Sequence, residues 1–225
     1  MRQLLLDVVP SPAPTLANFL PGRNAEPVCL LQHILSSQER ERFVYLWGGL
    51  GCGKSHLLQA IVHEYSQKNL DAVYIACESH TDFNLNIEID CVAVDNVERL
   101  DASAQIKLFN LYNQIRDEGT TLLLVSGHAA PAQLALRQDL VTRLGWGLVY
   151  HIHELTEAEK IEAMRSHAAD CGFDLPQEIC VYLLRHTRRD LPSLINIIDA
   201  LNRYSLSNKR QITIPMLRKL LQGTS

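Results

Sequence analysis

The stretch FVYLWGGLGCGKSHLLQAIV, residues 43–62, decides the fold. It opens on a short apolar run typical of a buried strand, passes through a glycine-rich turn, and then places Leu57, Leu58, Ile61 and Val62 at helical spacing. Strand, turn and helix in this order begin a crossover unit, whose strands run parallel in one sheet. The sequence therefore predicts an α/β fold around this segment.

The turn fits the phosphate-loop pattern G-x-x-x-x-G-K-[ST]. Glycines let successive backbone N–H groups point at phosphate oxygens, the lysine reaches the terminal phosphates, and the last hydroxyl can hold Mg²⁺. A glycine-rich turn that matches by chance is the alternative, and the flanking strand and helix argue against it. The nucleotide contacts are expected at Gly48, Gly49, Gly51, Cys52, Gly53, Lys54, Ser55 and His56.

The alternation of strand and helix continues on both sides of this loop. Further helices are predicted at 25–36 and 103–116, and further strands at 72–77, 91–94, 121–125 and 148–152. This pattern predicts a doubly wound parallel sheet flanked by helices.

After residue 154 the strand signals nearly vanish, and helix-start signals replace them. Thr156 and Glu159 form a capping-box pattern, Pro176 and Asp190 stand at the starts of two more helices, and Thr213 precedes a fourth. Alternating prolines among the first residues disfavour helix there. We expect three parts: a flexible tail at 1–14, a nucleotide-binding core at 15–154 and a small helical domain at 155–225.

Composition excludes several classes of protein. The net charge is −4, whereas an autonomous DNA-binding domain is expected to carry a basic surface. The six cysteines show no metal-binding spacing, which fits reduced thiols in a cytosol. Because no secretory signal and no membrane-spanning run is visible, the sequence predicts a soluble cytoplasmic protein that does not bind membranes.

Asp95 follows the apolar run 91–94, where a P-loop NTPase needs a carboxylate to order its metal ion. We therefore expect Ser55 and Asp95 to hold the metal, with a turn or helix-cap aspartate as the alternative. Asn96 comes next, where an active hydrolase of this kind usually carries an acid. Because an amide cannot accept a proton, the sequence predicts weak or no autonomous ATP hydrolysis, with Glu98 as the less favoured base.

Together with the phosphate loop, three further segments resemble one family. VTRLGWGL at 141–148, TLANFLPGRNAE at 15–26 and RQITIPMLRKLL at 210–221 are similar to segments of the DnaA family of bacterial AAA+ initiators, and the resemblance covers nearly the whole chain. Within that family the chain looks most like the short regulators that inactivate the initiator. The resemblance implies the AAA+ fold, with a P-loop core and an α-helical lid, and it implies ADP or ATP with Mg²⁺ as cofactors, ADP being expected.

The resemblance also implies contacts with partners. Regulators of this kind carry an N-terminal Gln-Leu-x-Leu-x-apolar peptide that docks in an apolar groove of the sliding clamp, the β subunit of DNA polymerase III. Residues Gln3, Leu4, Leu6 and Val8 fit this peptide. A stray apolar N-terminus or a strand packed on the core is the alternative. The chain would then reach DNA only through the clamp. A homodimer is a further partner that the sequence neither predicts nor excludes.

Arg143 lies in the stretch that, in this superfamily, faces the nucleotide of a neighbouring subunit. The resemblance implies that it is an arginine finger acting in trans on DnaA, while a pairing with Asp139, four residues earlier, is the alternative. Ser126, at the first-sensor position after the run 121–125, is expected to orient a phosphate or a water, and His128 reads as a solvated loop histidine.

The chain departs from the initiators at three places. It ends directly after the lid, where initiators continue into a helix-turn-helix domain, so duplex recognition is not expected. Residues 79–88 are too few for the helix pair that handles single-stranded DNA in initiators. Pro192 stands at the position of the family's second-sensor arginine, and Arg188 or Arg189 is the candidate substitute.

The leading hypothesis is a negative regulator that binds adenine nucleotide, rides on the clamp and makes DnaA hydrolyse its ATP. The rival is an autonomous AAA+ ATPase such as a helicase loader, which would hydrolyse its own ATP in a homomeric ring. Asn96 and the clamp-like tail count against the rival.

Overall fold

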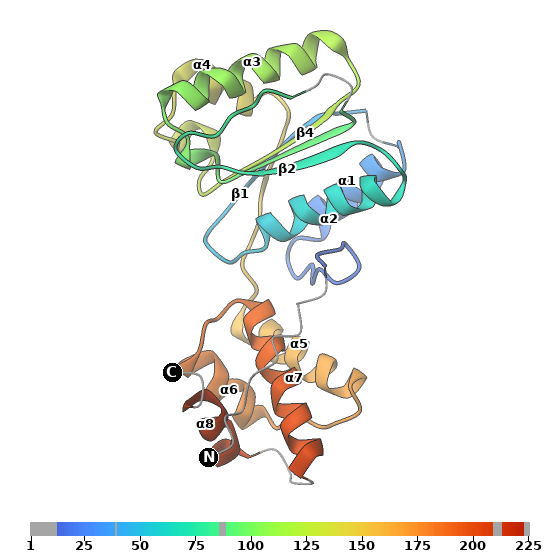
Figure 1. The fold of residues 1–225 in the computed structure, drawn as a ribbon, viewed down its shortest axis with the longest axis vertical. Coiled ribbons are helices and arrows are strands. Elements are labelled where there is room, and N and C mark those ends of the chain that lie inside the picture. The colour runs from blue at the N-terminus through green and yellow to red at the C-terminus, as the bar shows by residue number, and fades with distance from the viewer. Residues whose placement is uncertain (1–12, 39, 86–88, 209–212, 223–225) are drawn as a thin grey trace. The chain divides into compact units, whose positions relative to one another are not determined.

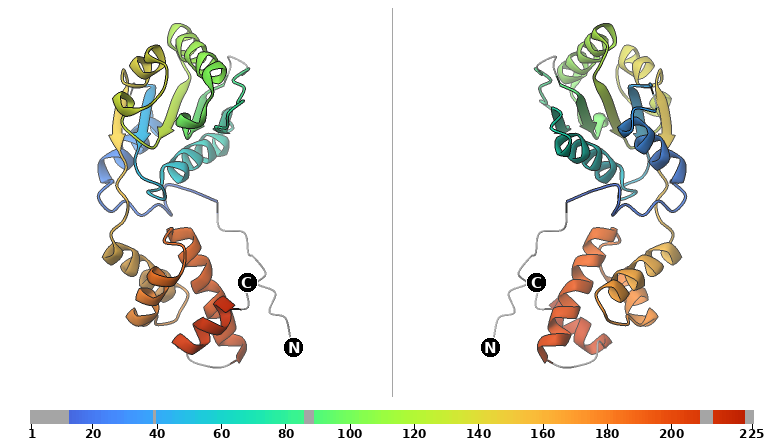
Figure 2. Two further views of the ribbon diagram at one scale, coloured as in Figure 1. Left: turned by 90° about the vertical axis from the view of Figure 1, so that its left-hand side faces the viewer. Right: turned by 90° about the vertical axis from the view of Figure 1, so that its right-hand side faces the viewer.

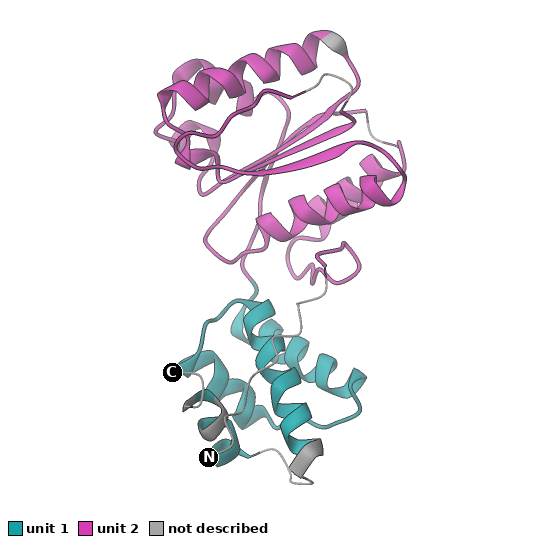
Figure 3. Cartoon of the chain, viewed as in Figure 1, with its two compact units in different colours: residues 1–12, 155–225 teal, residues 13–154 magenta. Residues whose placement is uncertain are grey.

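The computed structural model describes residues 13–38, 40–85, 89–208 and 213–222. The chain divides into two compact units: Ala13–Glu154 form one, and the residues from Leu155 onward belong to the other (Figure 3). Of the tail predicted at 1–14, residues 1–12 lie outside the described residues.

The first unit is built on five parallel strands: β1 (Phe43–Trp47), β2 (Ala72–Ala76), β3 (Cys91–Asp95), β4 (Leu122–Gly127) and β5 (Leu148–His151). Their order in the sheet is β2-β3-β4-β1-β5, with each neighbouring pair parallel. β3 and β4 are buried along their whole length, because helices cover both faces, and they are apolar up to Val94 and Val125, where polar residues follow. The predicted parallel α/β sheet is confirmed.

Helices cover the two faces of this sheet (Figures 1 and 2). On one face α1 (Ala25–Leu35) and α2 (Lys54–Gln67) pack through Leu31, Leu57 and Ile61 against the strands. On the other face α3 (Ala102–Glu118) and α4 (Gln138–Leu144) pack through residues such as Leu108 and Leu140. Two short 3-10 turns, η1 (Val97–Arg99) and η2 (Pro131–Gln133), follow β3 and β4.

The second unit contains four helices among its described residues: α5 (Glu157–Asp170), α6 (Gln177–His186), α7 (Leu191–Asn208) and α8 (Ile214–Gln222). The predicted capping box is present, since the Thr156 hydroxyl accepts from the Glu159 N–H at 3.2 Å and the Glu159 carboxylate accepts from the Thr156 N–H at 2.7 Å. Met164, Leu183 and Leu201 belong to a separate apolar core.

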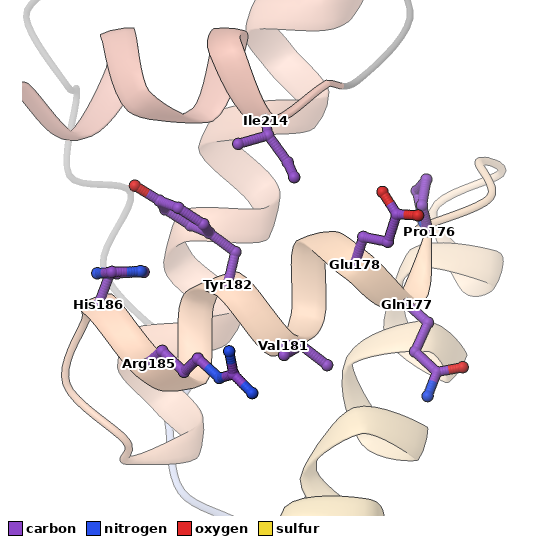
Figure 4. A pocket seen from close by; sticks show the side chains of 8 residues that line it. All are labelled: Pro176, Gln177, Glu178, Val181, Tyr182, Arg185, His186 and Ile214. Atoms are coloured by element: carbon purple, nitrogen blue, oxygen red, sulfur yellow. The ribbon is translucent and has the colours of Figure 1, made fainter.

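One side of α6 lines an open cavity of about 780 Å³ within this second unit. Figure 4 shows its lining, which is Pro176, Gln177, Glu178, Val181, Tyr182, Arg185, His186 and Ile214. The lining mixes charged groups with an aromatic ring, so this is not a dry apolar pocket. None of the helices in the described ranges is both long and apolar enough to cross a membrane.

Candidate nucleotide site

The phosphate loop connects the end of β1 to the start of α2, as the sequence predicts. Gly51 and Gly53 adopt left-handed backbone conformations with φ of 79° and 104°, which side chains rarely tolerate. At Gly48 a Cβ atom would stand 2.3 Å from the carbonyl oxygen of Ile152. Glycine is therefore required at these positions by the loop's own geometry, independently of any ligand.

Lys54, the first residue of α2, turns its side chain back over this loop. Its Nζ donates to the carbonyl oxygens of Gly48 at 2.7 Å and Gly49 at 2.9 Å, and it lies 3.6 Å from Cys52 Sγ. The residue is only 7% exposed. A buried ammonium group that is held inside the loop matches the charge of a bound phosphate.

Asp95 is the last residue of β3 and is only 1% exposed. Its carboxylate accepts from the Tyr74 hydroxyl at 2.7 Å and from the Ser126 hydroxyl. The Ser126 oxygen also accepts from the Asn96 N–H at 3.0 Å. Ser126 is fully buried and fixes the acidic strand end, and its predicted contact with phosphate or water stays a prediction.

Tyr74 joins the acidic strand end to the phosphate loop. Burial raises its pKa to about 12, as does the hydrogen bond to Asp95, while side-chain hydrogen bonds with Gln59 and Ser55 act in the opposite direction. The phenol therefore stays protonated and donates to the carboxylate across the neutral pH range. Through Tyr74 the structure brings Ser55 and Asp95, the two residues predicted to hold a metal ion, into one network.

The donor set of this network fits Mg²⁺. A hydroxyl from Ser55 and a carboxylate from Asp95 are the hard oxygen ligands that this ion prefers. The described partners of the Asp95 carboxylate are the hydroxyls of Tyr74 and Ser126, and neither of them is a cation. The residues present are suited to the cation that accompanies nucleotide phosphates.

Asn96 follows in a left-handed conformation with φ of 60°, which asparagine tolerates better than most residues. Glu98, on η1, places Oε1 3.6 Å from His128 Nδ1, and within the described part of the chain its buried Oε2 has no hydrogen-bond partner. The pKa of the neighbouring Cys77 thiol is raised to about 12, by burial first and then by Asp95 and Glu98. This thiol is therefore unreactive at neutral pH.

The segment before α1 lies against the phosphate loop. The Thr15 carbonyl is 2.9 Å from His56 Nε2, and the Phe19 ring lies 5.5 Å from the His56 ring. Phe19 also packs on Gly53 so closely that a Cβ there would come within 2.7 Å of its ring. Asn24 exchanges two hydrogen bonds with the His153 backbone, at 2.8 and 2.7 Å, which tie this segment to the chain after β5.

Arg143 lies near the end of α4, on the helix face that meets two aromatic rings. Its guanidinium carbon is 3.8 Å from the Trp146 ring centroid and 5.5 Å from that of Phe109. The alternative pairing with Asp139 is wrong, because Asp139 accepts from Arg137 Nη2 at 2.8 Å instead. Trp146 itself is 56% exposed, whereas Arg143 is partly buried, and within the described part of the chain its buried Nε has no hydrogen-bond partner.

The remaining predicted positions fall elsewhere. Gln3, Leu4, Leu6 and Val8 lie outside the described residues. Pro192 is the second residue of α7, where proline is tolerated, and Arg189 Nη1 lies 3.6 Å from Glu157 Oε1 on exposed surface. This ion pair is internal to the helical unit.

A phosphate loop between β1 and α2, a buried aspartate at the end of β3 and a separate helical unit after the sheet define a P-loop protein of the AAA+ class. A family model described as the bacterial DnaA ATPase domain matches residues 12–151, and one described as the lid domain of Hda matches residues 157–221. The chain belongs to the DnaA family of AAA+ proteins.

Solved structures agree with this fold. Domain III of DnaA from Thermotoga maritima has a TM-score of 0.72 at 23% identity, covering 92% of this chain and 95% of that one. AMPPCP-bound DnaA from Aquifex aeolicus has a TM-score of 0.70 at 21% identity, covering 88% of this chain and 68% of that one. The RuvB branch-migration motor of Thermotoga maritima has a TM-score of 0.66 at 15% identity, covering 93% and 71%.

Three residues of the site were missed by sequence reasoning. Tyr74 was read only as part of a strand, although a tyrosine beside the acidic strand could have signalled a buried hydrogen bond. Phe19 lies in the segment 15–26 that resembles the family, but nothing in that segment marks its side chain as a neighbour of the loop. Trp146 lies three residues after Arg143, a helical spacing that could have suggested the stacking.

Proposed function

We propose that this chain is a regulator of DNA replication initiation that holds an adenine nucleotide, ADP in its working state, docks on the sliding clamp and stimulates hydrolysis of the ATP bound to DnaA. Membership of the DnaA family makes it a replication-initiation protein with an AAA+ nucleotide-binding fold. DnaA structures that carry AMPPCP support an adenine nucleotide as the ligand.

The nucleotide would be held by groups already in position. The N–H groups of the phosphate loop and the helix start would receive the phosphate oxygens, and Lys54 would exchange the carbonyls of Gly48 and Gly49 for them. Ser55 and Asp95 would hold the Mg²⁺, which neutralises phosphate charge when it is bound. These parts account for binding, and none of them abstracts a proton.

The observation that carries the proposal is Asn96, which directly follows the buried Asp95. Its amide is neutral and cannot take a proton from an attacking water, so a general-base contribution of roughly 10²- to 10⁴-fold is missing. A complete binding site without this base suits a protein that keeps its nucleotide as a structural cofactor.

Arg143 is the residue that we propose acts on the ATP bound to DnaA. In phosphoryl transfer, negative charge spreads over the γ-phosphoryl oxygens, and a planar, permanently charged guanidinium stabilises that state. Stacking on Trp146 fixes the guanidinium, and none of the ion pairs among the described residues gives it a carboxylate that would neutralise it. Two observations support the proposed contact with the clamp: the peptide that contains Gln3 and Leu4 fits the docking pattern, and the chain belongs to the DnaA family.

A second candidate is the autonomous ATPase. Glu98 favours it, since its buried Oε2 lacks a hydrogen-bond partner in the described part of the chain and it stands two residues after Asn96. In this reading Glu98 would act as the base and ATP would be turned over by the chain alone.

One reconstitution separates the two. DnaA carrying labelled ATP is mixed with clamp-loaded DNA and this chain, and ADP formation is followed, with the clamp, DnaA or the chain left out in turn. We expect hydrolysis on DnaA only when all components are present, and turnover by the chain alone below about 1 s⁻¹, the low end for enzymes. Faster turnover by the chain alone, abolished by Glu98→Gln, would replace the proposal with the second candidate.

A further inference from the structure

Three potential metal ligands meet in the helical unit, away from the phosphate loop in the sequence. His167 on α5 places Nε2 2.7 Å from Asp199 Oδ1 on α7, and Cys171 Sγ is 3.8 Å from the same Nε2. One ligand atom from each residue lies within 4.8 Å of the other two. In the part of the chain that the structure describes, no other group of three or more His, Cys, Asp or Glu side chains converges in this way.

Local structure fixes this arrangement. His167 and Cys171 are four residues apart, so the last turn of α5 puts them on one face. Cys171 caps the helix, its N–H donating to the His167 carbonyl at 3.1 Å, and Gly172 turns the chain away with a left-handed φ of 82°. Asp199 comes from α7, whose Ile198 and Leu201 belong to the same apolar core as Met164 and Ala168 of α5.

A cysteine, a histidine and an aspartate also suggest a nucleophilic triad, but the geometry is wrong for one. In such a triad the thiol and the carboxylate bind opposite nitrogens of the imidazole ring. Here both approach the same atom, Nε2.

We propose that His167, Cys171 and Asp199 bind one zinc ion, with a fourth position left to solvent. Mixed sulfur, nitrogen and carboxylate ligands are those of zinc sites. A tetrahedral ion with the usual bond lengths separates its sulfur and nitrogen ligands by about 3.6 Å and its nitrogen and oxygen ligands by about 3.4 Å. The observed 3.8 and 2.7 Å differ from these values by amounts that side-chain rotation can supply.

The site is open to an ion from solution. The side chains of His167 and Asp199 are 32% and 37% exposed, and Cys171 is exposed. Since the ligands come from α5 and α7, a bound ion joins two helices of the lid and stabilises the folded unit. This site could not be predicted from the sequence, because Asp199 is far from Cys171 along the chain.

The chain also contains a matched control. Cys29 and His33 on α1 have the same spacing, with Cys29 Sγ 3.7 Å from His33 Nε2, and Cys29 is exposed like Cys171. The structure groups no third ligand with that pair in the described residues. The other four cysteines are buried, so a thiolate–metal signal from the folded protein must come from Cys29 or Cys171.

The test is a titration of the reduced full chain with Co²⁺, followed by the thiolate-to-cobalt charge-transfer absorption and by displacement with Zn²⁺. We expect one equivalent with a thiolate band, lost in Cys171→Ser and kept in Cys29→Ser. Asp199→Asn should lower Co²⁺ affinity by at least about tenfold. Circular dichroism melts of the metal-free variants check that each is folded.

Three results would overturn the proposal. They are a wild-type protein with no thiolate–cobalt band, a band that survives in Cys171→Ser, and Asp199→Asn binding Co²⁺ as tightly as wild type. Cobalt bound only through oxygen, as at Asp95, would give no such band and would count against the site. Because the readout involves neither nucleotide nor DnaA, it is independent of the proposed function.

Discussion

We expect Lys54 to make the strongest single contribution to nucleotide binding. Its ammonium is buried among the carbonyls of Gly48 and Gly49, in surroundings where an interaction with phosphate gains more than it would in water. Hydrogen bonds to charged groups are worth roughly 1.5 to 3 kcal/mol each. We therefore expect the affinity for nucleotide to depend on this side chain more than on any one loop N–H.

Lys54→Ala should lower ADP affinity by at least about tenfold, the lower end of that range converted to a binding constant. Isothermal titration with ADP measures this loss directly. The matched control is Lys68→Ala at the other end of α2, whose Nζ donates to the Leu35 carbonyl. ADP bound equally tightly by Lys54→Ala and wild type would remove the lysine from the site.

Trp146 is a second single residue with a testable role, because its ring stacks on the guanidinium of Arg143. A cation–π contact contributes roughly 0.5 to 2 kcal/mol, so Trp146→Ala should reduce stimulation of DnaA-bound ATP hydrolysis by about two- to thirtyfold. Trp146→Phe keeps an aromatic face and should retain most of the stimulation. The reconstituted hydrolysis assay compares the two variants, and equal rates for them would show that the ring has no positioning role.

The sequence predicts the role of a single residue when the partners of that residue are close to it along the chain. The phosphate loop and Asp95 follow from spacing, since their chemistry requires fixed positions along the chain. Tyr74 and Phe19 could not be assigned, because their partners are distant in sequence and meet them only after the sheet has formed.

At the scale of elements, the strands and the longer helices were predicted well, and the shortest helical segments were not. The strands and the helices α1 and α3 agree with the predictions to within two residues at each end. The helix α4 and the turns η1 and η2 were not predicted, because a few residues carry too little periodicity to be recognised. The strand order β2-β3-β4-β1-β5 depends on tertiary packing and was not available from local pattern.

Substitution of Gly53, with Gly119 outside the loop as the control, tests whether Phe19 constrains the phosphate loop. Gly53 and Gly119 have similar left-handed φ values, 104° and 100°, but a Cβ at Gly53 meets Phe19 at 2.7 Å while one at Gly119 meets nothing within 4 Å. Gly119→Ala should therefore cost about 1 to 2 kcal/mol in the free energy of unfolding through strain alone.

Gly53→Ala should cost about 1 to 3 kcal/mol more, because it also overpacks the ring. It should further weaken ADP binding, whereas Gly119→Ala should leave ADP binding unchanged. Urea unfolding and ADP titration of both variants supply the comparison. Equal losses of stability would mean that Phe19 does not constrain the loop.

At the scale of the whole molecule, the proposed nucleotide binding and the proposed clamp docking use separate parts of the chain. The phosphate loop lies in the unit Ala13–Glu154, while the proposed clamp peptide precedes it. Changing both Gln3 and Leu4 to Ala should lower clamp affinity by about thirty- to a thousandfold, the loss expected for two anchors of a short peptide. ADP affinity should stay as it is.

Leu5→Ala is the control for this pair, because Leu5 occupies the variable position between the two leucine anchors. Surface plasmon resonance on immobilised clamp compares the variants with wild type. If the double variant binds the clamp like wild type, or if Leu5→Ala weakens binding as much, the peptide does not dock as proposed.

The central claim is that Arg143 acts on the nucleotide of DnaA, and one measurement tests it most directly. DnaA carrying labelled ATP is incubated with clamp-loaded DNA and wild type, Arg143→Ala or Arg137→Ala, the last removing an exposed arginine that pairs with Asp139. Because arginine fingers contribute roughly 10³- to 10⁵-fold to rate, Arg143→Ala should lose nearly all stimulation while still binding ADP and clamp. Arg137→Ala should behave like wild type. Stimulation by Arg143→Ala within a few-fold of wild type would contradict the account.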